Sequence, residues 1–497
     1  MHIDRNKFGV MGDSAMTSKV SKALGATNKG INLALKSAIF YTIATVVGQG
    51  VVLISTRLFT TVMTVEEWGI VQTYGAWVLL LSSPIGMNLQ ISIRNAYTDY
   101  PDKVSAFSSS TLFCSTLFFG GFLIIGVGGA ILLRQNLLLV LLALVQAFAL
   151  YVVNFHSIKL SMGYHYKLRS ILLCGPNVLH TLLSAVLILF LPQMPSSIGK
   201  ILGNTIGIAI FAIFSYSVIL YQGHHLINID YWKYSLAISV PAIAYSLSNL
   251  VLMHCDRIMI TAFVGSAETA IYSNAYNIGS ILYVLLTATG QAWMPWLFMV
   301  LDKGQQGKAQ PVAIANILFF SVAAICLLLV SPEILKLLTP QQYWGGIDYL
   351  PPIVYASFMI FLYSMPTSVE FYLKKTKIIA RNTLIAAFVN ILLNALFIPL
   401  FGAIAAAYTT VFCYILLFFL QWYSAKRQMP NIFHGRPFLI AAAIVGLFCV
   451  LFYCIKYSIW IRYGLCLALV ALVVTVFIKN KDKILMQFRA SNENIDS

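Results

Sequence analysis

The stretch LMHCDRIMITAFVG, residues 252–265, places Asp256 beside Arg257 in an otherwise apolar run that is long enough to cross a membrane. A charged side chain at the centre of a bilayer costs about 2.5–3.5 kcal/mol on insertion scales, so a charge retained there is a candidate for function. Adjacent side chains on a helix point about 100° apart, so these two cannot simply neutralise each other. Two interpretations stay open. The pair acts in coupling or gating within a cavity, or it lies at the outer interface, where both charges reach the headgroups.

Other polar side chains in or beside apolar runs are candidates for substrate binding. Arginine suits phosphate because its planar guanidinium bonds two oxygens at once. Four arginines near the ends of apolar runs are candidates: Arg57, Arg94, Arg257 and Arg381. A sugar chain would be bound by amides, hydroxyls and aromatic faces, and Asn249 and Asn390 are two such amides within the runs. Further side chains of these kinds are Tyr272, Tyr276, Asn277, Gln291, Trp293 and Asn394.

Glu370 is the second acidic candidate, near the inner end of its apolar run. It precedes Lys374 by four residues, the spacing of a stabilising ion pair on a helix surface. The alternative is that Glu370 couples transport to protons or cations. The eight cysteines lie in apolar segments without a CxxC spacing, so they are expected to be small buried hydrophobes, and no metal site is expected.

The composition assigns the chain to a class. It has 497 residues, of which 59% are apolar and 10% charged, with a mean hydropathy of +0.83. Soluble domains are about 45–50% apolar and about 25% charged, so this is an integral membrane protein. We expect an all-α polytopic fold of about fourteen transmembrane helices, each near the length that a bilayer core requires. The expected spans are 38–58, 70–93, 107–132, 137–155, 170–191, 200–221, 235–262, 270–298, 311–331, 349–371, 378–399, 402–423, 437–455 and 458–478.

The net charge of +16 follows the topology. With both termini placed in the cytoplasm, 25 of the 32 Lys and Arg residues fall on the inner side and seven on the outer side. This distribution obeys the positive-inside rule, so the basic excess predicts anionic membrane lipids as a partner and argues against nucleic acid.

An internal similarity predicts two related halves. Residues 56–76 resemble residues 256–278, with Arg57 matching Arg257 and Tyr74 matching Tyr276. An offset of six helices preserves orientation, so the halves should be related by a pseudo-two-fold axis along the membrane normal. The expected parts are a basic cytoplasmic segment (1–37), an N-lobe of helices 1–6 (38–221), a cytoplasmic inter-lobe loop (222–234), a C-lobe of helices 7–12 (235–423), helices 13–14 (437–478) and a cytoplasmic tail (479–497). Residues 14–36 fit an amphipathic surface helix or a disordered tail equally well.

Three segments carry a resemblance to a known family. They are TRLFTTVMTVEEWGIVQTYGAWVLLL (56–81), IRNAY (93–97) and DRIMITAFVGSAETAIYSNAY (256–276). Together they resemble the polysaccharide-transporter branch of the multidrug/oligosaccharidyl-lipid/polysaccharide exporter superfamily, and the similarity of layout covers nearly the whole chain. The resemblance implies two six-helix lobes that form a V around a cavity open alternately to each side. It also implies a polyprenyl-pyrophosphate-linked oligosaccharide as substrate, no cofactor, and transport driven by a gradient of H⁺ or Na⁺.

A flippase for O-antigen, capsule or exopolysaccharide repeat units in the inner membrane of a bacterium is therefore the expected function. A glycan polymerase and a chain-length regulator are expected as partners. The sequence has no DxD motif and no connection of domain size, which argues against an enzyme. Two alternatives remain, a cation-coupled multidrug antiporter of the same superfamily and a flippase for lipid-linked cell-wall precursors. The scarcity of acidic residues in the spans favours an anionic substrate over a cationic drug.

Overall fold

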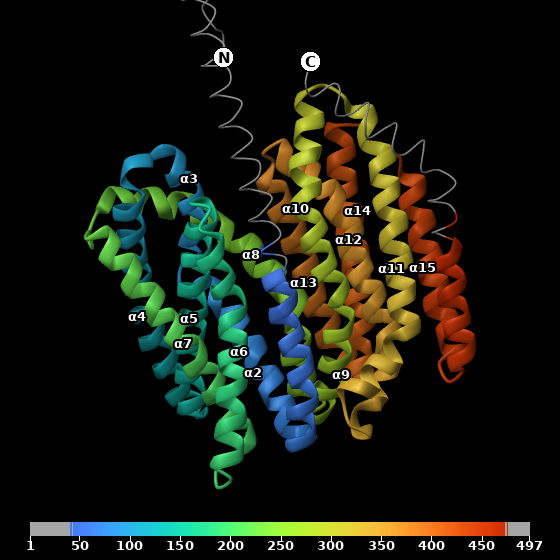
Figure 1. The fold of residues 1–497 in the computed structure, drawn as a ribbon, viewed down its shortest axis with the longest axis horizontal. Coiled ribbons are helices and arrows are strands. Elements are labelled where there is room, and N and C mark those ends of the chain that lie inside the picture. The colour runs from blue at the N-terminus through green and yellow to red at the C-terminus, as the bar shows by residue number, and fades with distance from the viewer. Residues whose placement is uncertain (1–39, 42, 473–474, 476–497) are drawn as a thin grey trace, which may run out of the picture.

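The computed structural model describes residues 40–41, 43–472 and 475, and these fold into helices joined by short connections (Figure 1). Twelve of the described helices are long and apolar enough to cross a membrane, and a bent pair, Val65–Ile85 with Leu89–Asp99, makes a thirteenth. A shorter apolar helix, Ile459–Leu472, follows them. The expected all-α polytopic fold is confirmed.

The helices follow the expected spans in order. Their bounds are Ile43–Val62, α2 Val65–Ile85, η2 Leu89–Ile91, α3 Ser92–Asp99, η3 Pro101–Lys103, α4 Val104–Leu132, α5 Leu137–Met162, α6 Tyr166–Phe190, α7 Ser196–Gly223, α8 Ile229–Phe263, α9 Ser266–Gly279, α10 Ile281–Asp302, η4 Gln306–Lys308, α11 Ala309–Leu338, η5 Gln341–Tyr349, α12 Leu350–Tyr372, α13 Thr376–Phe401, α14 Ala403–Gln428, α15 Gly435–Ile455 and Ile459–Leu472.

Local sequence signals determine where several helices begin. The Thr64 hydroxyl accepts a hydrogen bond from the Glu67 N–H, and the Glu67 carboxylate accepts one from the Thr64 N–H, which forms a capping box at the start of α2. The Asn228 side chain caps α8 by accepting bonds from the N–H groups of Asp230 and Tyr231. This cap extends α8 back to Ile229, so the helix begins six residues before the expected start and the loop expected at 222–234 is shorter.

Some expectations fall on parts of the chain outside the described residues. These are the basic segment 1–37 with its amphipathic stretch 14–36, and the tail 479–497.

Two large hydrophobic cores account for most of the buried apolar side chains of the described chain, and a small third cluster holds Ala96, Phe107 and Tyr231. One large core is drawn mainly from residues 59–219 and the other from residues 252–452. We call the helices from Ile43–Val62 to α7 the N-lobe, and α8 to α14 the C-lobe. In Figure 1 the bulk of the two lobes stands on opposite sides, with α2, α8 and α9 between them.

The last two helices pack on the outside of the C-lobe. Arg462 donates from Nη1 to the Glu333 carboxylate and to the Leu329 carbonyl, both at 2.6 Å, and so attaches Ile459–Leu472 to α11. In the connection between α15 and Ile459–Leu472, Lys456 donates a hydrogen bond to Asp348 at 2.5 Å, and this bond raises the pKa of the Lys456 ammonium.

α8 is the longest helix of the described chain and reaches both lobes. Near its beginning, Ser235 hydrogen-bonds Ser92 and Thr111 of the N-lobe at 3.1 and 3.3 Å. In the same region the Trp232 indole N–H donates to the Ser110 carbonyl at 2.9 Å. Near its other end, α8 packs against α9 and α13 of the C-lobe. One continuous helix therefore connects the two lobes.

Candidate functional site

The two lobes meet at one end of the bundle, which we call the α9 end. Here the Trp68 indole N–H donates to the Asn274 side-chain oxygen at 3.1 Å, and the hydroxyls of Thr73 and Thr261 lie 2.5 Å apart. Gly69 packs so closely on α9 that a Cβ at this position would lie 1.7 Å from the Ser266 carbonyl oxygen. These contacts join α2 to α9 and to the end of α8, within the segments that the internal similarity had paired, and they close the α9 end.

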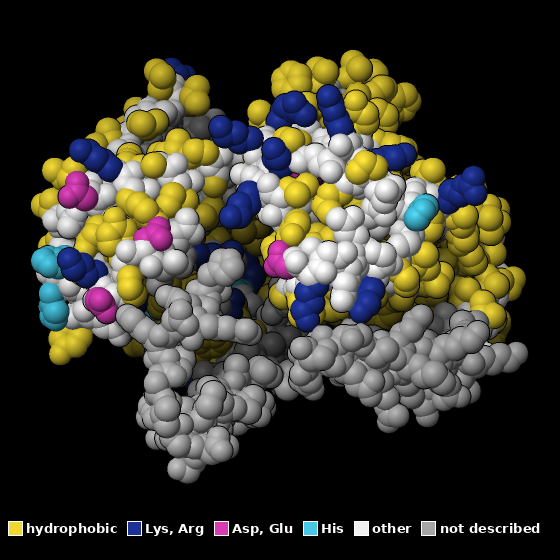
Figure 2. All heavy atoms as spheres, turned by 90° about the horizontal axis from the view of Figure 1, so that it is seen from above, with side chains coloured by type: hydrophobic (Ala, Val, Ile, Leu, Met, Phe, Trp, Pro, Cys, Tyr) yellow, Lys and Arg dark blue, Asp and Glu magenta, His cyan; other side chains and the backbone are white. Residues whose placement is uncertain are grey.

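The opposite end, which we call the α3 end, is open between the lobes. Seen onto this end, the surface is hollowed between the two lobes, and Lys and Arg side chains surround the hollow (Figure 2). The hollow has the form expected of one state of an alternating-access transporter.

Asp256 lies at the centre of a buried polar cluster in the C-lobe. Its side chain is 1% exposed. The Asn394 amide donates to Oδ1 at 2.8 Å, while Tyr272 and Thr410 donate their hydroxyls to Oδ2 at 2.7 and 2.8 Å. Asn390 extends the cluster, because its amide donates to Thr410 and its oxygen accepts from Asn394, both at 3.3 Å. Three donors from three other helices make this buried carboxylate tolerable.

Arg257 is buried on another side of α8 and has no carboxylate partner among the described residues. Its Nη1 donates to the Met253 carbonyl at 3.2 Å and lies 2.9 Å from His254 Nδ1. The guanidinium stacks 4.5 Å from the centroid of the Tyr276 ring, and Nε has no hydrogen-bond partner within the described chain. A buried cation with an unused donor is suited to an anion.

The positions of Asp256 and Arg257 bear on the interpretation that the pair lies at the outer interface and reaches the headgroups. α8 continues for six residues beyond Arg257, to Phe263, and both side chains are buried against the C-lobe. This burial does not fit charges that extend into the headgroups.

Glu370 does not form the expected ion pair with Lys374. It is fully buried, and both carboxylate oxygens lack a hydrogen-bond partner among the described residues. α12 ends at Tyr372 and Lys374 has a φ of 56°, so the chain leaves the helix before it completes the i, i+4 geometry.

Helix geometry places Gln421 of α14 at the level of Glu370. Tyr363 of α12 and Tyr414 of α14 stack with ring centroids 6.0 Å apart. Glu370 and Gln421 lie seven residues further along these two helices, about two turns, so they stand at the same level. Gln421 is also fully buried, and its Nε2 lacks a partner within the described chain.

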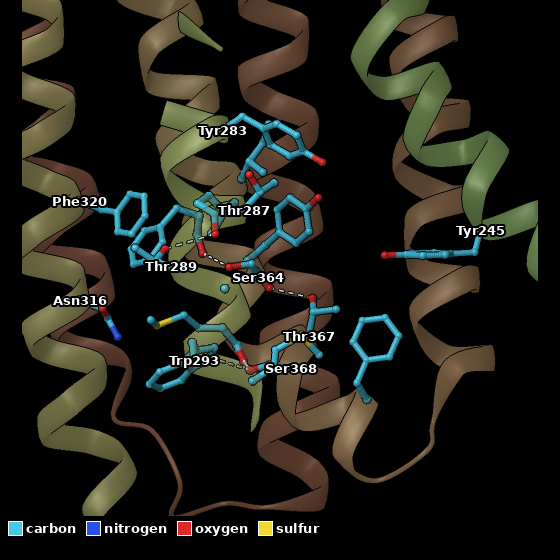
Figure 3. Close-up of a pocket in the computed structure, with 18 residues that line it drawn as sticks. Tyr245, Tyr283, Thr287, Thr289, Trp293, Asn316, Phe320, Ser364, Thr367 and Ser368 are labelled. Atoms are coloured by element: carbon cyan, nitrogen blue, oxygen red, sulfur yellow. Dashed lines mark hydrogen bonds between the residues drawn. The ribbon is translucent and has the colours of Figure 1, made fainter. Parts of the chain in front are cut away.

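A pocket of about 240 Å³ lies within the C-lobe, between α8, α10, α11 and α12 (Figure 3). Its lining is aromatic and hydroxylated, and the Trp293 indole N–H donates to the Ser368 hydroxyl at 3.1 Å. The side chains of Tyr245 and Tyr283 point toward the same open space. The lining comprises Tyr245, Tyr283, Leu286, Thr287, Thr289, Gly290, Trp293, Met294, Asn316, Phe320, Ile360, Phe361, Tyr363, Ser364, Met365, Thr367, Ser368 and Phe371.

The remaining sequence-predicted residues are dispersed. Arg57, Arg94 and Arg381 are exposed, and among their guanidinium groups only that of Arg381 has a hydrogen bond within the described chain, to Asn382 at 3.5 Å. Asn249 is half-buried and donates to the Tyr245 carbonyl of its own helix. The structure thus brings Asn390 to Asp256, while the exposed arginines join neither Asp256 nor Arg257.

Sequence reasoning missed two groups of residues. Thr410 and the hydroxylated lining of the pocket gave no signal, because Ser and Thr are common in apolar helices and often bond their own backbone. Lys159 and Lys200 were counted as loop charges but are buried in the N-lobe. Lys159 donates to Gln222 at 2.9 Å, and the Lys200 ammonium lies 3.6 Å from the centroid of the Phe59 ring.

Comparisons with known proteins place these features in context. A sequence model of the family described as "Polysaccharide biosynthesis protein" matches residues 34–301. An uncharacterized membrane protein of Methanocaldococcus jannaschii is 24% identical to this chain over 206 residues, which is 40% of this chain and 40% of that protein. The match therefore spans about two fifths of the length of this relative.

Two solved structures share the fold. The lipid II flippase MurJ in an inward closed conformation has a TM-score of 0.67 at 14% identity, over 90% of this chain and 100% of that chain. An inward-facing multidrug resistance transporter of the MATE family, in the MOP superfamily, has a TM-score of 0.63 at 14% identity, over 80% of this chain and 98% of that chain.

Proposed function

The chain belongs to the polysaccharide biosynthesis protein family and has the fold of MOP-superfamily flippases and transporters, and from this premise we propose that it flips polyprenyl-pyrophosphate-linked oligosaccharide repeat units. The units would pass from the inner to the outer leaflet of the cytoplasmic membrane by alternating access. They would supply the assembly of O-antigen, capsule or exopolysaccharide. No catalytic residue is needed, because the substrate leaves chemically unchanged.

One observation carries the proposal: a buried arginine without a carboxylate partner among the described residues shares the C-lobe with an aromatic and hydroxylated pocket. The Nε of Arg257 has no hydrogen-bond partner within the described chain, and its guanidinium stacks on Tyr276. Tyr276 is on α9, which packs against α12, the helix of the pocket residue Tyr363. A lipid-linked sugar needs these two chemistries together, a cation for its pyrophosphate and hydroxyl-binding groups for its glycan.

The orientation follows from the charge distribution. Since Lys and Arg surround the hollow at the α3 end, we assign this end to the cytoplasm. The exposed Arg94 and Arg381 would attract the pyrophosphate there, and Asn249 and Asn390 would bind it or its sugars further in. Arg57 would act near the α9 end, where the substrate leaves.

Coupling to an ion gradient would involve the two buried acids of the C-lobe. Asp256 is surrounded by hydroxyl and amide groups from α9, α13 and α14, and a change in its charge would alter three hydrogen bonds at once. Glu370 has no such partners in the described chain and would be neutral when protonated. Both are therefore proposed as coupling or gating residues.

The test is a strain from which the gene is deleted, complemented with the wild-type or Arg257→Ala gene. We expect the deletion to accumulate polyprenyl-linked glycan, measured by mass spectrometry of extracted lipids, and to lose surface polymer. Loss of a charge-assisted hydrogen bond is worth about 1.5–3 kcal/mol, so Arg257→Ala should reduce transport about tenfold to a hundredfold. Arg257→Lys should rescue only partly, because lysine lacks the two-pronged geometry.

The other candidate functions predict other outcomes. An unchanged lipid pool with greater sensitivity to cationic compounds would favour a multidrug antiporter. Accumulation of a cell-wall precursor, with surface polymer intact, would favour a precursor flippase. Arg134→Ala is the matched control, because Arg134 is an exposed arginine at the α9 end.

A further inference from the structure

We propose that the pocket between α8, α10, α11 and α12 is a binding site for an uncharged sugar residue of the transported glycan. This inference rests on the proposed function, and it adds a location and a selectivity. It predicts that neutral sugars are preferred at this position over acidic or amino sugars.

Charge is the first argument. None of the eighteen lining residues is Asp, Glu, Lys, Arg or His. An acidic sugar in this pocket would be a charge without a partner, and transfer of an unpaired charge out of water is costly. The absence of charge in the lining is unlike the α3 end, where Lys and Arg are abundant (Figure 2).

The hydrogen-bonding groups of the lining are the second argument. Thr287, Ser364 and Thr367 donate their hydroxyl protons to carbonyls of their own helices, at 2.8, 2.7 and 2.8 Å. Their oxygens therefore remain available as acceptors. The hydroxyls of a sugar are donors as well as acceptors, so they match this lining. Asn316 adds an amide from α11, which supplies both functions (Figure 3).

Aromatic faces and size are the third argument. Trp293 is oriented by its bond to Ser368, and Tyr245 faces the pocket from α8. Aromatic rings provide flat apolar surfaces with a polar edge, which suits the alternating C–H and O–H groups of a sugar ring. The pocket volume of about 240 Å³ lies below the 300–1,000 Å³ range of typical ligand pockets, so it accommodates a single ring.

The location connects the pocket to the proposed transport path. Tyr363 lines the pocket together with Tyr245 and Tyr283, and its helix α12 packs against α9, whose Tyr276 stacks on Arg257. A ligand whose phosphate contacts Arg257 would therefore have its glycan close to the pocket. α8 forms one wall, and this is the helix that joins the lobes.

The experiment measures binding to the full-length protein in lipid nanodiscs. The probes are farnesyl diphosphate, farnesyl-diphospho-N-acetylglucosamine and farnesyl-diphospho-glucuronic acid. We expect the neutral-sugar probe to bind about tenfold more tightly than the acidic-sugar probe, and more tightly than the probe without sugar. This comparison uses the wild-type chain, so it does not depend on the folding of a variant.

Variants then locate the site. Tyr245→Phe together with Thr367→Val removes two hydroxyls and preserves shape, so we expect the affinity for the neutral-sugar probe to fall about fivefold to tenfold. Binding of farnesyl diphosphate should not change. Tyr221→Phe is the matched control, because Tyr221 is 78% exposed and lies outside the pocket.

The outcomes separate this inference from the proposed function. Equal affinity for all three probes, or loss of farnesyl diphosphate binding in the double variant, would overturn the sugar site and leave the flippase proposal intact. Binding of none of the probes by folded protein would contradict the flippase proposal itself, and the sugar site with it.

Discussion

The two lobes share an architecture but differ in the charges that they bury. Among the described residues, the buried basic side chains of the N-lobe are His156, Lys159 and Lys200, and no carboxylate is buried there. The C-lobe buries two carboxylates, Asp256 and Glu370, together with Arg257. A buried charge is costly, so its retention marks a functional requirement more strongly than an exposed charge does. This contrast is the reason that the proposed ion coupling is placed at the acids of the C-lobe.

Positions that match in the internal similarity have different surroundings in the two halves. Arg57 and Arg257 occupy matching places in the two halves, yet Arg57 is exposed and Arg257 is buried against Tyr276. A shared fold preserves the backbone, while the neighbouring side chains decide what an arginine can do.

The largest expected effect comes from removing the charge at the centre of the C-lobe cluster. Asp256→Asn keeps the shape but leaves the hydroxyls of Tyr272 and Thr410 without a charged acceptor. A charge-assisted bond contributes about 1.5–3 kcal/mol, so we expect transport to fall about a hundredfold with normal protein abundance. Complementation of the deletion strain measures this, with exposed Asp102→Asn as control. Activity near that of the wild type would mean that the ion chemistry lies elsewhere.

The next effect concerns the contact between the lobes. Gly69→Ala places a Cβ against the Ser266 carbonyl, so the α9 end cannot close as it does here. We expect transport to fall about tenfold, because a population shift of about 1.4 kcal/mol is enough for that change. A cysteine placed at Ala270, in a chain without its eight native cysteines, should react faster with a membrane-impermeant reagent.

A control on the same helix isolates the steric effect. Gly75 has open space around its Cβ position, so Gly75→Ala should leave both transport and labelling unchanged. Equal behaviour of the two variants would show that the contact at Gly69 does not hold the α9 end closed.

A smaller effect distinguishes the two acids of the C-lobe. Glu370→Gln removes a carboxylate that has no described partner, so we expect thermal stability to stay equal or to rise by about 1 kcal/mol. Asp256→Asn should lower stability, since three donors depend on that carboxylate. Thermal unfolding in detergent compares the two, with exposed Glu66→Gln as reference. A strong loss of stability in Glu370→Gln would reveal a structural ion pair.

The smallest expected effect tests whether Arg57 and Arg257, which match in the two halves, differ in importance for transport. Arg57→Ala should reduce transport by no more than about fivefold, because an exposed charge contributes about 0–1 kcal/mol. The assay is the one used for Arg257→Ala. A reduction as large as that of Arg257→Ala would restore the functional equivalence implied by the internal similarity.

The sequence predicted the class of fold and part of the site, for identifiable reasons. Apolar length and charge distribution depend on the bilayer, so they predicted the helices without knowledge of packing. Asp256 and Asn390 stood out because polar groups are costly in apolar runs. Their common neighbour Thr410 is 154 residues from Asp256, and only the packing of α8, α13 and α14 brings these residues together.

Other parts of the site depend on features that periodicity does not report. The pairing of Glu370 with Lys374 assumed a helix that in fact ends at Tyr372. The burial of Lys159 depends on α5 extending to Met162, beyond the expected end of its span at 155. Helix ends in polar sequence are set by local caps and tertiary contacts, and an apolar-length argument places them poorly.

The continuity of α8 has a mechanical consequence. Its 35 residues span about 52 Å, far more than the roughly 30 Å core of a bilayer. The beginning of α8 is hydrogen-bonded to the N-lobe, and Asp256 near its other end is hydrogen-bonded to the C-lobe. The helix therefore fixes the distance between these two attachment points. A change in the angle between the lobes then requires α8 to bend. Pro241 lies between the two attachment points and lacks the N–H of a helical hydrogen bond, so the helix is expected to bend there. The stiffness of one proline turn would thus limit both how far and how fast the transporter can rock.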